Sequence, residues 1–236
     1  MNKHFTNGLS VLAAFTGGKE LDNSASAVTF LGPTSSTYAD QYNPRAEWSV
    51  GAQDVSRIFT LGYTYELPFG RGKRYLNTGG VVNRVLGGWQ AAGIIRYTTG
   101  TPVVLAGVGD PTGLFTLGQR PLWSGKSAKL DHPTLNEWFD TSVFSPLPNF
   151  TIGNAPRTIP NVRVPGVSNS DLSFFKNNYF GSEDRYNAQI RVEMFNAFNH
   201  PRFGAPDANV NDSTFGKITS TVNSARQIQL ALKFVF

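Results

Sequence analysis

The sequence predicts an all-β fold, an antiparallel transmembrane β-barrel to which this chain contributes about six strands and long outer loops. The first observation is that segments of roughly 9–13 residues alternate apolar with polar side chains, which is the length that a tilted strand needs to cross a bilayer. The second is that charged residues make up only 16% of the 236 residues while aromatic residues reach 13%, unlike the composition of soluble domains. The third is that glycine and proline occur along the whole chain, which predicts many turns and no long helices.

Three strands are predicted in the N-terminal half, over residues 5–17, 57–69 and 89–101. Each places apolar side chains at alternate positions, as one face of a β-strand requires. The alternation in the first strand also argues against a signal peptide at the N-terminus, whose apolar stretch is continuous. The apolar positions are Phe5, Leu9, Val11, Ala13 and Phe15 in the first strand, Phe59, Leu61, Tyr63, Tyr65, Leu67 and Phe69 in the second, and Trp89, Ala91, Ile95 and Tyr97 in the third.

Three more strands are predicted over residues 167–179, 186–196 and 226–236. The first of these alternates less clearly, with Leu172 and Phe174 as its apolar positions. The other two have one apolar face and one largely polar face, the arrangement of a strand that separates lipid from a lumen. Their apolar positions are Tyr186, Ala188, Ile190, Val192 and Met194, followed by Ile228, Leu230, Leu232, Phe234 and Phe236.

The connections between the predicted strands alternate between short and long. Bacterial barrels have short periplasmic turns and long extracellular loops. With the last strand ending in the periplasm, residues 181–184 form a short periplasmic turn and residues 70–88 a moderate one. The long outer loops are then residues 18–56, 102–166 and 199–225.

Six strands cannot close a membrane barrel. In hydrocarbon every backbone N–H and C=O needs an internal partner, so strands cross a membrane only in closed barrels, the smallest of which have about eight strands. We therefore expect this chain to be the C-terminal part of a longer barrel whose other strands precede Met1. A soluble β-sandwich, in which the apolar faces pack against each other, is the alternative.

The largest predicted loop contains candidate elements of its own. Residues 133–140 are compatible with one or two helical turns in which Trp138 is packed. The loop aromatics either stack on a sugar or an aromatic chelator or pack the loop against itself. They are Trp123, Trp138, Phe144 and Phe150.

Charged side chains at the alternate, polar positions of the strands are candidates for lining a barrel lumen. They either line a substrate path or pair with one another. Aromatic side chains near the strand ends are candidates for the membrane interface, where such rings are enriched. The lumen candidates are Glu66, Arg96, Arg191, Glu193 and Lys233, and the interface candidates are Tyr65, Phe69, Trp89 and Tyr97.

The sequence offers no residue pattern for catalysis, a metal or a cofactor, so we expect a protein that is not an enzyme. The chain contains no cysteine, and His4, His132 and His200 each lack a second ligand at metal spacing. No G-x-S-x-G nucleophile motif is present. The basic residues are scattered apart from a small cluster at residues 71–74, which argues against a nucleic-acid partner.

Several motifs follow one another in an order that resembles the barrel ends of TonB-dependent outer-membrane receptors, and above all the Oar-like group, whose members often carry a carboxypeptidase-regulatory-like domain. The resemblance runs along essentially the whole chain. The motifs are YELPFGRGKR at residues 65–74, LGGWQ at 86–90, NAPR at 154–157, FNAFNHP at 195–201 and the terminal Phe236.

The resemblance implies a bacterial outer-membrane protein, surrounded by lipid, that imports an unidentified substrate. The TonB complex of such receptors pulls on a plug domain, which this chain does not include. The terminal strand also resembles the signal that the barrel-assembly machinery reads, which here would be Leu230, Leu232, Phe234 and Phe236. The alternative function is a structural or adhesive surface barrel whose loops bind a partner.

Overall fold

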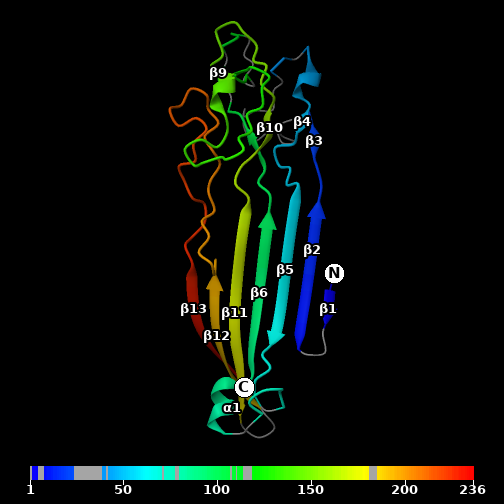
Figure 1. The fold of residues 1–236 in the computed structure, drawn as a ribbon, viewed down its shortest axis with the longest axis vertical. Coiled ribbons are helices and arrows are strands. Elements are labelled where there is room, and N and C mark those ends of the chain that lie inside the picture. The colour runs from blue at the N-terminus through cyan, green and yellow to red at the C-terminus, as the bar shows by residue number, and fades with distance from the viewer. Residues whose placement is uncertain are drawn as a thin grey trace.

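Seven strands form one antiparallel sheet in the order β1-β2-β5-β6-β11-β12-β13, so each strand pairs with the next one of the sheet along the chain (Figure 1). The structure, a computed structural model, describes residues 2–4, 8–23, 39–40, 42–70, 72–77, 80–106, 108–109, 111–113, 119–180 and 185–236. The strands of this sheet are β1 (Asn2–His4), β2 (Leu9–Gly17), β5 (Arg57–Glu66), β6 (Trp89–Thr98), β11 (Val167–Phe180), β12 (Tyr186–Phe195) and β13 (Gln227–Val235).

The first predicted strand, over residues 5–17, is wrong at its N-terminal boundary. β2 begins at Leu9, and the chain before it forms the separate strand β1, which pairs antiparallel with β2 in the register Lys3↔Val11. Gly8 lies between the two strands with a φ of 75°, a conformation that glycine adopts without steric cost. Alternation of apolar residues does not reveal such a reversal of the chain, and the predicted position Phe5 lies outside the described residues.

The other predicted strands are confirmed, with small differences at their ends. β5 stops at Glu66 rather than at Phe69, because Pro68 has no N–H with which to continue the ladder. β6 stops at Thr98 rather than at Thr101. Beyond the strand, the backbone of Gly100 lies so close to Val164 that a Cβ atom on residue 100 would come within 1.8 Å of Val164 O. β11, β12 and β13 agree with the predicted ranges to within one residue at each end.

The strand register places the predicted apolar positions on one face of the sheet. Residues that are directly opposite each other on neighbouring strands share a face, and one such row crosses six strands from Leu9 to Leu230. We call this face the apolar face and the opposite one the polar face. The row consists of Leu9, Tyr65, Ala91, Phe174, Val192 and Leu230. The polar face carries Ser10, Thr60, Thr64, Glu66, Gln90, Arg96, Asn169, Asp171, Ser173, Gln189, Arg191, Glu193, Gln229 and Lys233.

The sheet has no hydrophobic core of its own. Among the described residues, every buried hydrophobic side chain lies outside the seven strands. A soluble β-sandwich would bury its apolar face against a second sheet, whereas the three small sheets of this protein lie beyond one end of the large one (Figure 1). An apolar face that no second sheet of the described residues covers is what a membrane-spanning sheet presents to lipid.

The long loops at one end of the sheet fold together into a structure that we call the cap, formed by the described residues of 18–56, 99–166 and 196–226. Backbone hydrogen bonds from Ala106 to Ala208 (3.0 Å) and from Ile218 to Leu135 (2.8 Å) join the last two of these loops. Its elements are β3 (Leu21–Asp22), η2 (Pro44–Glu47), β4 (Ser49–Val50), β7 (Pro102–Val104), β8 (Leu122–Trp123), η3 (Thr141–Val143), β9 (Phe144–Ser145) and β10 (Thr158–Arg163). Its core is Val103, Leu105, Ala128, Phe139, Val143, Phe144, Ala155, Ile159 and Val162.

The helical turns predicted over residues 133–140 are wrong. The N–H and C=O groups of Thr134 and Glu137 bond to each other at 2.8 and 3.2 Å, which makes a tight turn instead. The Asp140 carboxylate accepts a hydrogen bond from Ser142 N at 2.9 Å and so begins the short helix η3. Trp138 is packed against the cap core as expected, and so are two of the other loop aromatics, Trp123 and Phe144, whereas Phe150 is exposed.

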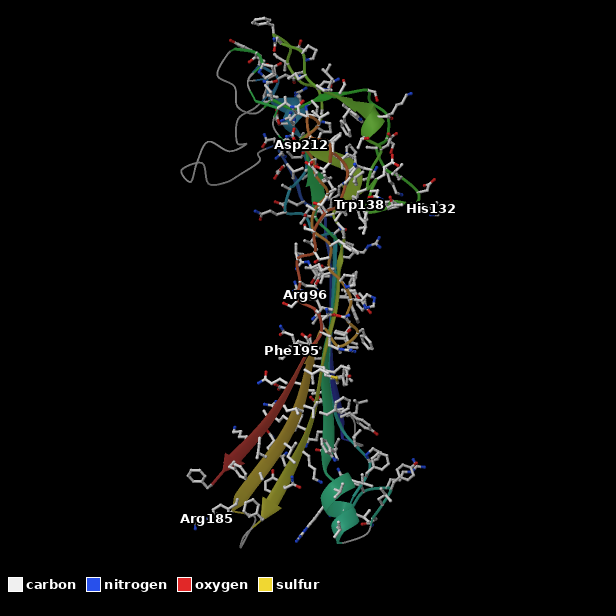
Figure 2. All side chains as sticks on the ribbon, turned by 90° about the vertical axis from the view of Figure 1, so that its left-hand side faces the viewer. Arg96, His132, Trp138, Arg185, Phe195 and Asp212 are labelled. Carbon is white, nitrogen blue, oxygen red and sulfur yellow. The ribbon has the colours of Figure 1, made fainter. Side chains whose placement is uncertain are left out.

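The opposite end of the sheet carries a short helix that the sequence did not predict, α1 (Val81–Leu86), within the connection of residues 70–88. Figure 2 shows this helix on one side of the sheet, while the lower ends of β11, β12 and β13 bend toward the other side. The predicted short turn at residues 181–184 lies outside the described residues. Among the residues that the structure describes, no helix is long and apolar enough to cross a membrane.

Candidate functional site

The five lumen candidates all lie on the polar face of the sheet. Glu66 and Lys233 are near its inner end, the end that carries α1, and Arg96 is near the cap. Arg191 and Glu193 follow each other on the same face of β12 and form an ion pair, with Nη2 to Oε1 at 3.3 Å. Glu66 pairs instead with Lys73, at 2.7 Å, in the connection that follows β5. In the described part of the chain Arg96 and Lys233 have no ion-pair partner.

Three of the four interface candidates lie on the apolar face, at two different heights. Tyr97 is at the cap end, in one row with Phe15 and Phe59. Tyr65 and Trp89 are at the inner end, and the Trp89 indole donates a hydrogen bond to Val85 O of α1 at 2.9 Å. Phe69 lies beyond the end of β5, with its ring centroid 6.0 Å from that of Tyr75.

The residues of the candidate assembly signal are among the exposed side chains of the apolar face. Leu230, Leu232 and Phe234 are exposed in β13, which pairs only with β12 and is therefore an edge of the sheet. Phe236 follows the strand and is 95% exposed. Nothing within the described chain covers these side chains.

The polar face is hollowed at mid-height by a depression of about 370 Å³. It is lined by small residues, among them Gly62 and Ala92, and by the apolar residues Leu12, Ile94 and Phe195. The sequence did not reveal this hollow, because the alternation leads one to expect polar residues on this face. The pairing of Leu12 with Gly62 and of Gly62 with Ile94 indicates the hollow, because a residue without a side chain lies between two apolar ones in the same row.

A second cavity, of about 250 Å³, lies where the polar face meets the cap. Arg96 from β6 and Arg202 from the cap are among the residues that line it. Arg202 is held in place by its backbone, since its N–H donates to Asn223 Oδ1 and its C=O accepts from Val222 N, each at 2.8 Å. The acidic residue of the polar face closest to Arg96 in the register, Asp171, accepts a hydrogen bond from Asn196 N at 2.9 Å. Neither guanidinium makes an ion pair with a described residue, so the cavity suits an anionic group.

A buried ionic network holds the loops of the cap together. The Glu47 carboxylate, 1% exposed, accepts hydrogen bonds from Arg120 Nη1 and Nη2, both at 3.0 Å, and from Ala39 N at 2.9 Å. Arg157 donates from Nε to Glu47 O at 2.9 Å and forms an ion pair with Asp22. These contacts join the loop between β2 and β5 to the loop between β6 and β11. The sequence reasoning missed the network, although Arg157 belongs to the NAPR motif at residues 154–157.

A second ionic contact joins the same loops directly above the sheet. Arg163 donates to Asp54 O and to Gly100 O, each at 2.9 Å, and pairs with the Asp54 carboxylate. Glu20 N also donates to that carboxylate, at 2.6 Å. Burial by itself would raise the pKa of Asp54, but the hydrogen bonds from Arg163 and Glu20 and the positive charge of Arg163 outweigh it, so the pKa lies below its ordinary value of 3.8.

The structure brings no metal-binding group together: among the described residues, no three His, Asp or Glu side chains are placed to hold an ion. In comparisons with known proteins, the model of a family described as "Outer membrane beta barrel domain" matches residues 1–229. No curated protein matches the chain, and no solved structure matches it.

Proposed function

Since the chain belongs to the family of outer membrane beta barrel domains, we propose that it forms part of the wall of a receptor that imports a substrate with energy from the TonB complex. The family places the protein in the bacterial outer membrane, and its strands are membrane-spanning. The TonB-dependent part of the proposal is supported by the order of motifs along the chain, from the YELPFGRGKR segment to the terminal Phe236.

The observation that carries the proposal is the separation of the two faces of the sheet. One face carries a row of apolar side chains from β2 to β13, and the other carries most of the charged and amide side chains of the long strands. In a closed barrel the polar face lines the lumen. A polar lumen beneath a folded cap supports passage of a hydrophilic substrate.

In this proposal the cavity between the cap and the polar face is where the substrate first binds. The guanidinium groups of Arg96 and Arg202 would each hold a carboxylate or phosphate oxygen pair, as their planar forks allow. The depression farther down, whose lining includes the apolar Leu12 and Ile94, would receive a less polar part of the same molecule. The TonB complex would act on a plug domain outside this chain.

We also propose that the barrel-assembly machinery recognises β13. Strand addition needs an edge with unpaired backbone groups, and apolar side chains at alternate positions give it specificity. The free edge of β13 and the exposure of Leu230, Leu232, Phe234 and Phe236 support this role.

The test of the import function compares cells that lack the gene with cells that lack TonB. Both are grown on a mixture of small anionic compounds, and depletion of each compound from the medium is followed by mass spectrometry. We expect both deletions to slow depletion of the same compounds. Uptake that needs the gene but proceeds normally without TonB would overturn the proposal.

The role of the cavity is tested separately in the intact protein with the double variant Arg96→Gln/Arg202→Gln. Loss of two charge-assisted hydrogen bonds, about 1.5–3 kcal/mol each, should weaken uptake at low substrate concentration by at least ~100-fold. Arg57→Gln is the matched control, because Arg57 lies at the same end of the sheet but on the apolar face. Equal effects of the two changes would refute a role for the cavity.

A further inference from the structure

Helix α1 exposes almost all of its apolar side chains. Val81, Val82, Val85 and Leu86 are 75%, 48%, 57% and 50% exposed, and no residue of the helix is buried. The segment before the helix also exposes apolar side chains, since Tyr75 and Leu76 are 48% and 43% exposed. An exposed apolar cluster of this kind marks an interaction surface.

The position of α1 excludes the lumen as the place where this surface is covered. The helix contacts the sheet through Trp89, whose Nε1 donates to Val85 O at 2.9 Å, and through Lys176, whose Nζ donates to Gly87 O and, at 3.5 Å, to Asn83 O. Trp89 and Lys176 are directly opposite each other on β6 and β11 and belong to the apolar face. The helix therefore lies outside the barrel wall, on the side shown in Figure 2. A domain inside the lumen cannot reach it.

Several carbonyl groups at the C-terminal end of α1 accept hydrogen bonds from protein donors. The last carbonyl groups of a helix have no partner within the helix, and on a solvated surface water supplies one. Here Gly87 N donates to Asn83 O at 2.9 Å. The Trp89 indole donates to Val85 O, and the Lys176 ammonium donates to Gly87 O. A carbonyl without a donor is unfavourable in a lipid environment, and these donors remove that penalty for Asn83, Val85 and Gly87.

Two basic side chains flank the apolar cluster. Lys73 is paired with Glu66, but Arg74 and Arg84 have no ion pair with any residue that the structure describes. The Arg74 guanidinium lies 5.3 Å from the centroid of the exposed Tyr75 ring. Apolar side chains bordered by free cationic groups are the composition of segments that lie in a membrane interface and attract anionic lipid headgroups.

We propose that α1 and residues 73–77 form a lipid-binding element that lies in the headgroup region of the periplasmic leaflet, with its aliphatic side chains among the acyl chains. Arg74 and Arg84 bind the phosphate of anionic phospholipids. The periplasmic side follows from the short connections at this end of the sheet, because barrels have their short turns there. The inference rests on the barrel architecture alone and holds whether or not the protein imports a substrate.

The test uses the absence of cysteine from this chain. A nitroxide label is attached at Val82→Cys in the intact protein, with any cysteine outside this chain replaced, and the control label at Asn136→Cys in the exposed part of the cap. The protein is reconstituted in phosphatidylethanolamine vesicles with and without phosphatidylglycerol. Collision of the label with oxygen, which concentrates in lipid, is compared with collision with a water-soluble nickel complex.

We expect the Val82 label to favour oxygen and the Asn136 label to favour the nickel complex. Phosphatidylglycerol should increase the shielding of the Val82 label from nickel, and the variant Arg74→Gln/Arg84→Gln should lose that increase. A Val82 label as open to nickel as the control would overturn the proposal. So would a label shielded from both reagents, which would mean that protein covers the helix, or shielding that is independent of phosphatidylglycerol.

Discussion

Replacing Glu47 by alanine is expected to unfold the cap locally while leaving the transmembrane sheet intact. Glu47 is 1% exposed and accepts two hydrogen bonds from Arg120 and one from Ala39 N. The change leaves Arg120 and Arg157, 7% and 6% exposed, buried without the carboxylate that neutralises them. Removing one partner of such a buried pair costs about 3–5 kcal/mol.

The assay is amide hydrogen exchange of the intact protein in the membrane. A cost of about 4 kcal/mol corresponds to exchange roughly 10³-fold faster for cap amides that open with the network. Suitable reporters are the N–H groups of Ala155 and Gly153, which donate to Pro121 O at 3.2 Å and to Gln119 Oε1 at 3.0 Å. The amides of β5 and β6 should keep their slow exchange.

The matched control is Glu137→Ala, which removes an exposed carboxylate from the same cap. It should leave exchange nearly unchanged, since exposed ionic contacts contribute about 0–1 kcal/mol. The double variant Glu47→Ala/Arg120→Ala should exchange more slowly than two additive losses would give, because it removes one of the stranded charges. If Glu47→Ala exchanges no faster than Glu137→Ala, the reasoning about the network is refuted.

Three further predictions concern the cap, the sheet and assembly. Because the pKa of Asp54 in the folded protein lies below its ordinary value of 3.8, the folded state binds fewer protons there; the stability that this carboxylate contributes is present above pH ~4 and is lost as the pH falls through the folded-state pKa. Proteolysis of the cap measured across that range should show the loss, and Asp54→Asn should remove the corresponding pH dependence. Gly93→Ala would put its Cβ atom 2.8 Å from the Tyr63 ring and should destabilise the sheet by ~1 kcal/mol in urea unfolding from vesicles, whereas Gly62→Ala, with nothing within 4 Å of the new atom, should not. Deletion of Phe236 should lower the fraction of protein that reaches the heat-modifiable folded form in the outer membrane without changing its synthesis, and an unchanged fraction would contradict the assembly role.

The sequence predicted the membrane strands well because each strand carries its own evidence. The period-two pattern in residues 186–196 or 226–236 can be recognised within each strand alone. Pairing of the strands then places the apolar positions of neighbouring strands directly opposite each other. The N-terminal strand was misjudged at Gly8 because a turn can interrupt an alternating pattern without altering it.

The cap and the helix could not be predicted in the same way. Glu47 meets Arg120 and Arg157 across 73 and 110 residues of chain, and no local pattern announces such contacts. α1 is too short for a periodic pattern of its own, and its placement depends on Trp89 and Lys176 from two different strands. The five lumen candidates share one face, but their role in transport stays a prediction.

The cap also has a mechanical consequence for the wall beneath it. The Glu47 network joins the hairpin of β2 and β5 to that of β6 and β11, and the hydrogen bonds from Ala106 and Ile218 join the latter to the hairpin of β12 and β13. The cap therefore connects the outer ends of three neighbouring hairpins. An outward force on the barrel wall near the cell surface is shared among the three hairpins. We therefore expect the wall to widen only at the inner ends of the strands, which the cap does not connect.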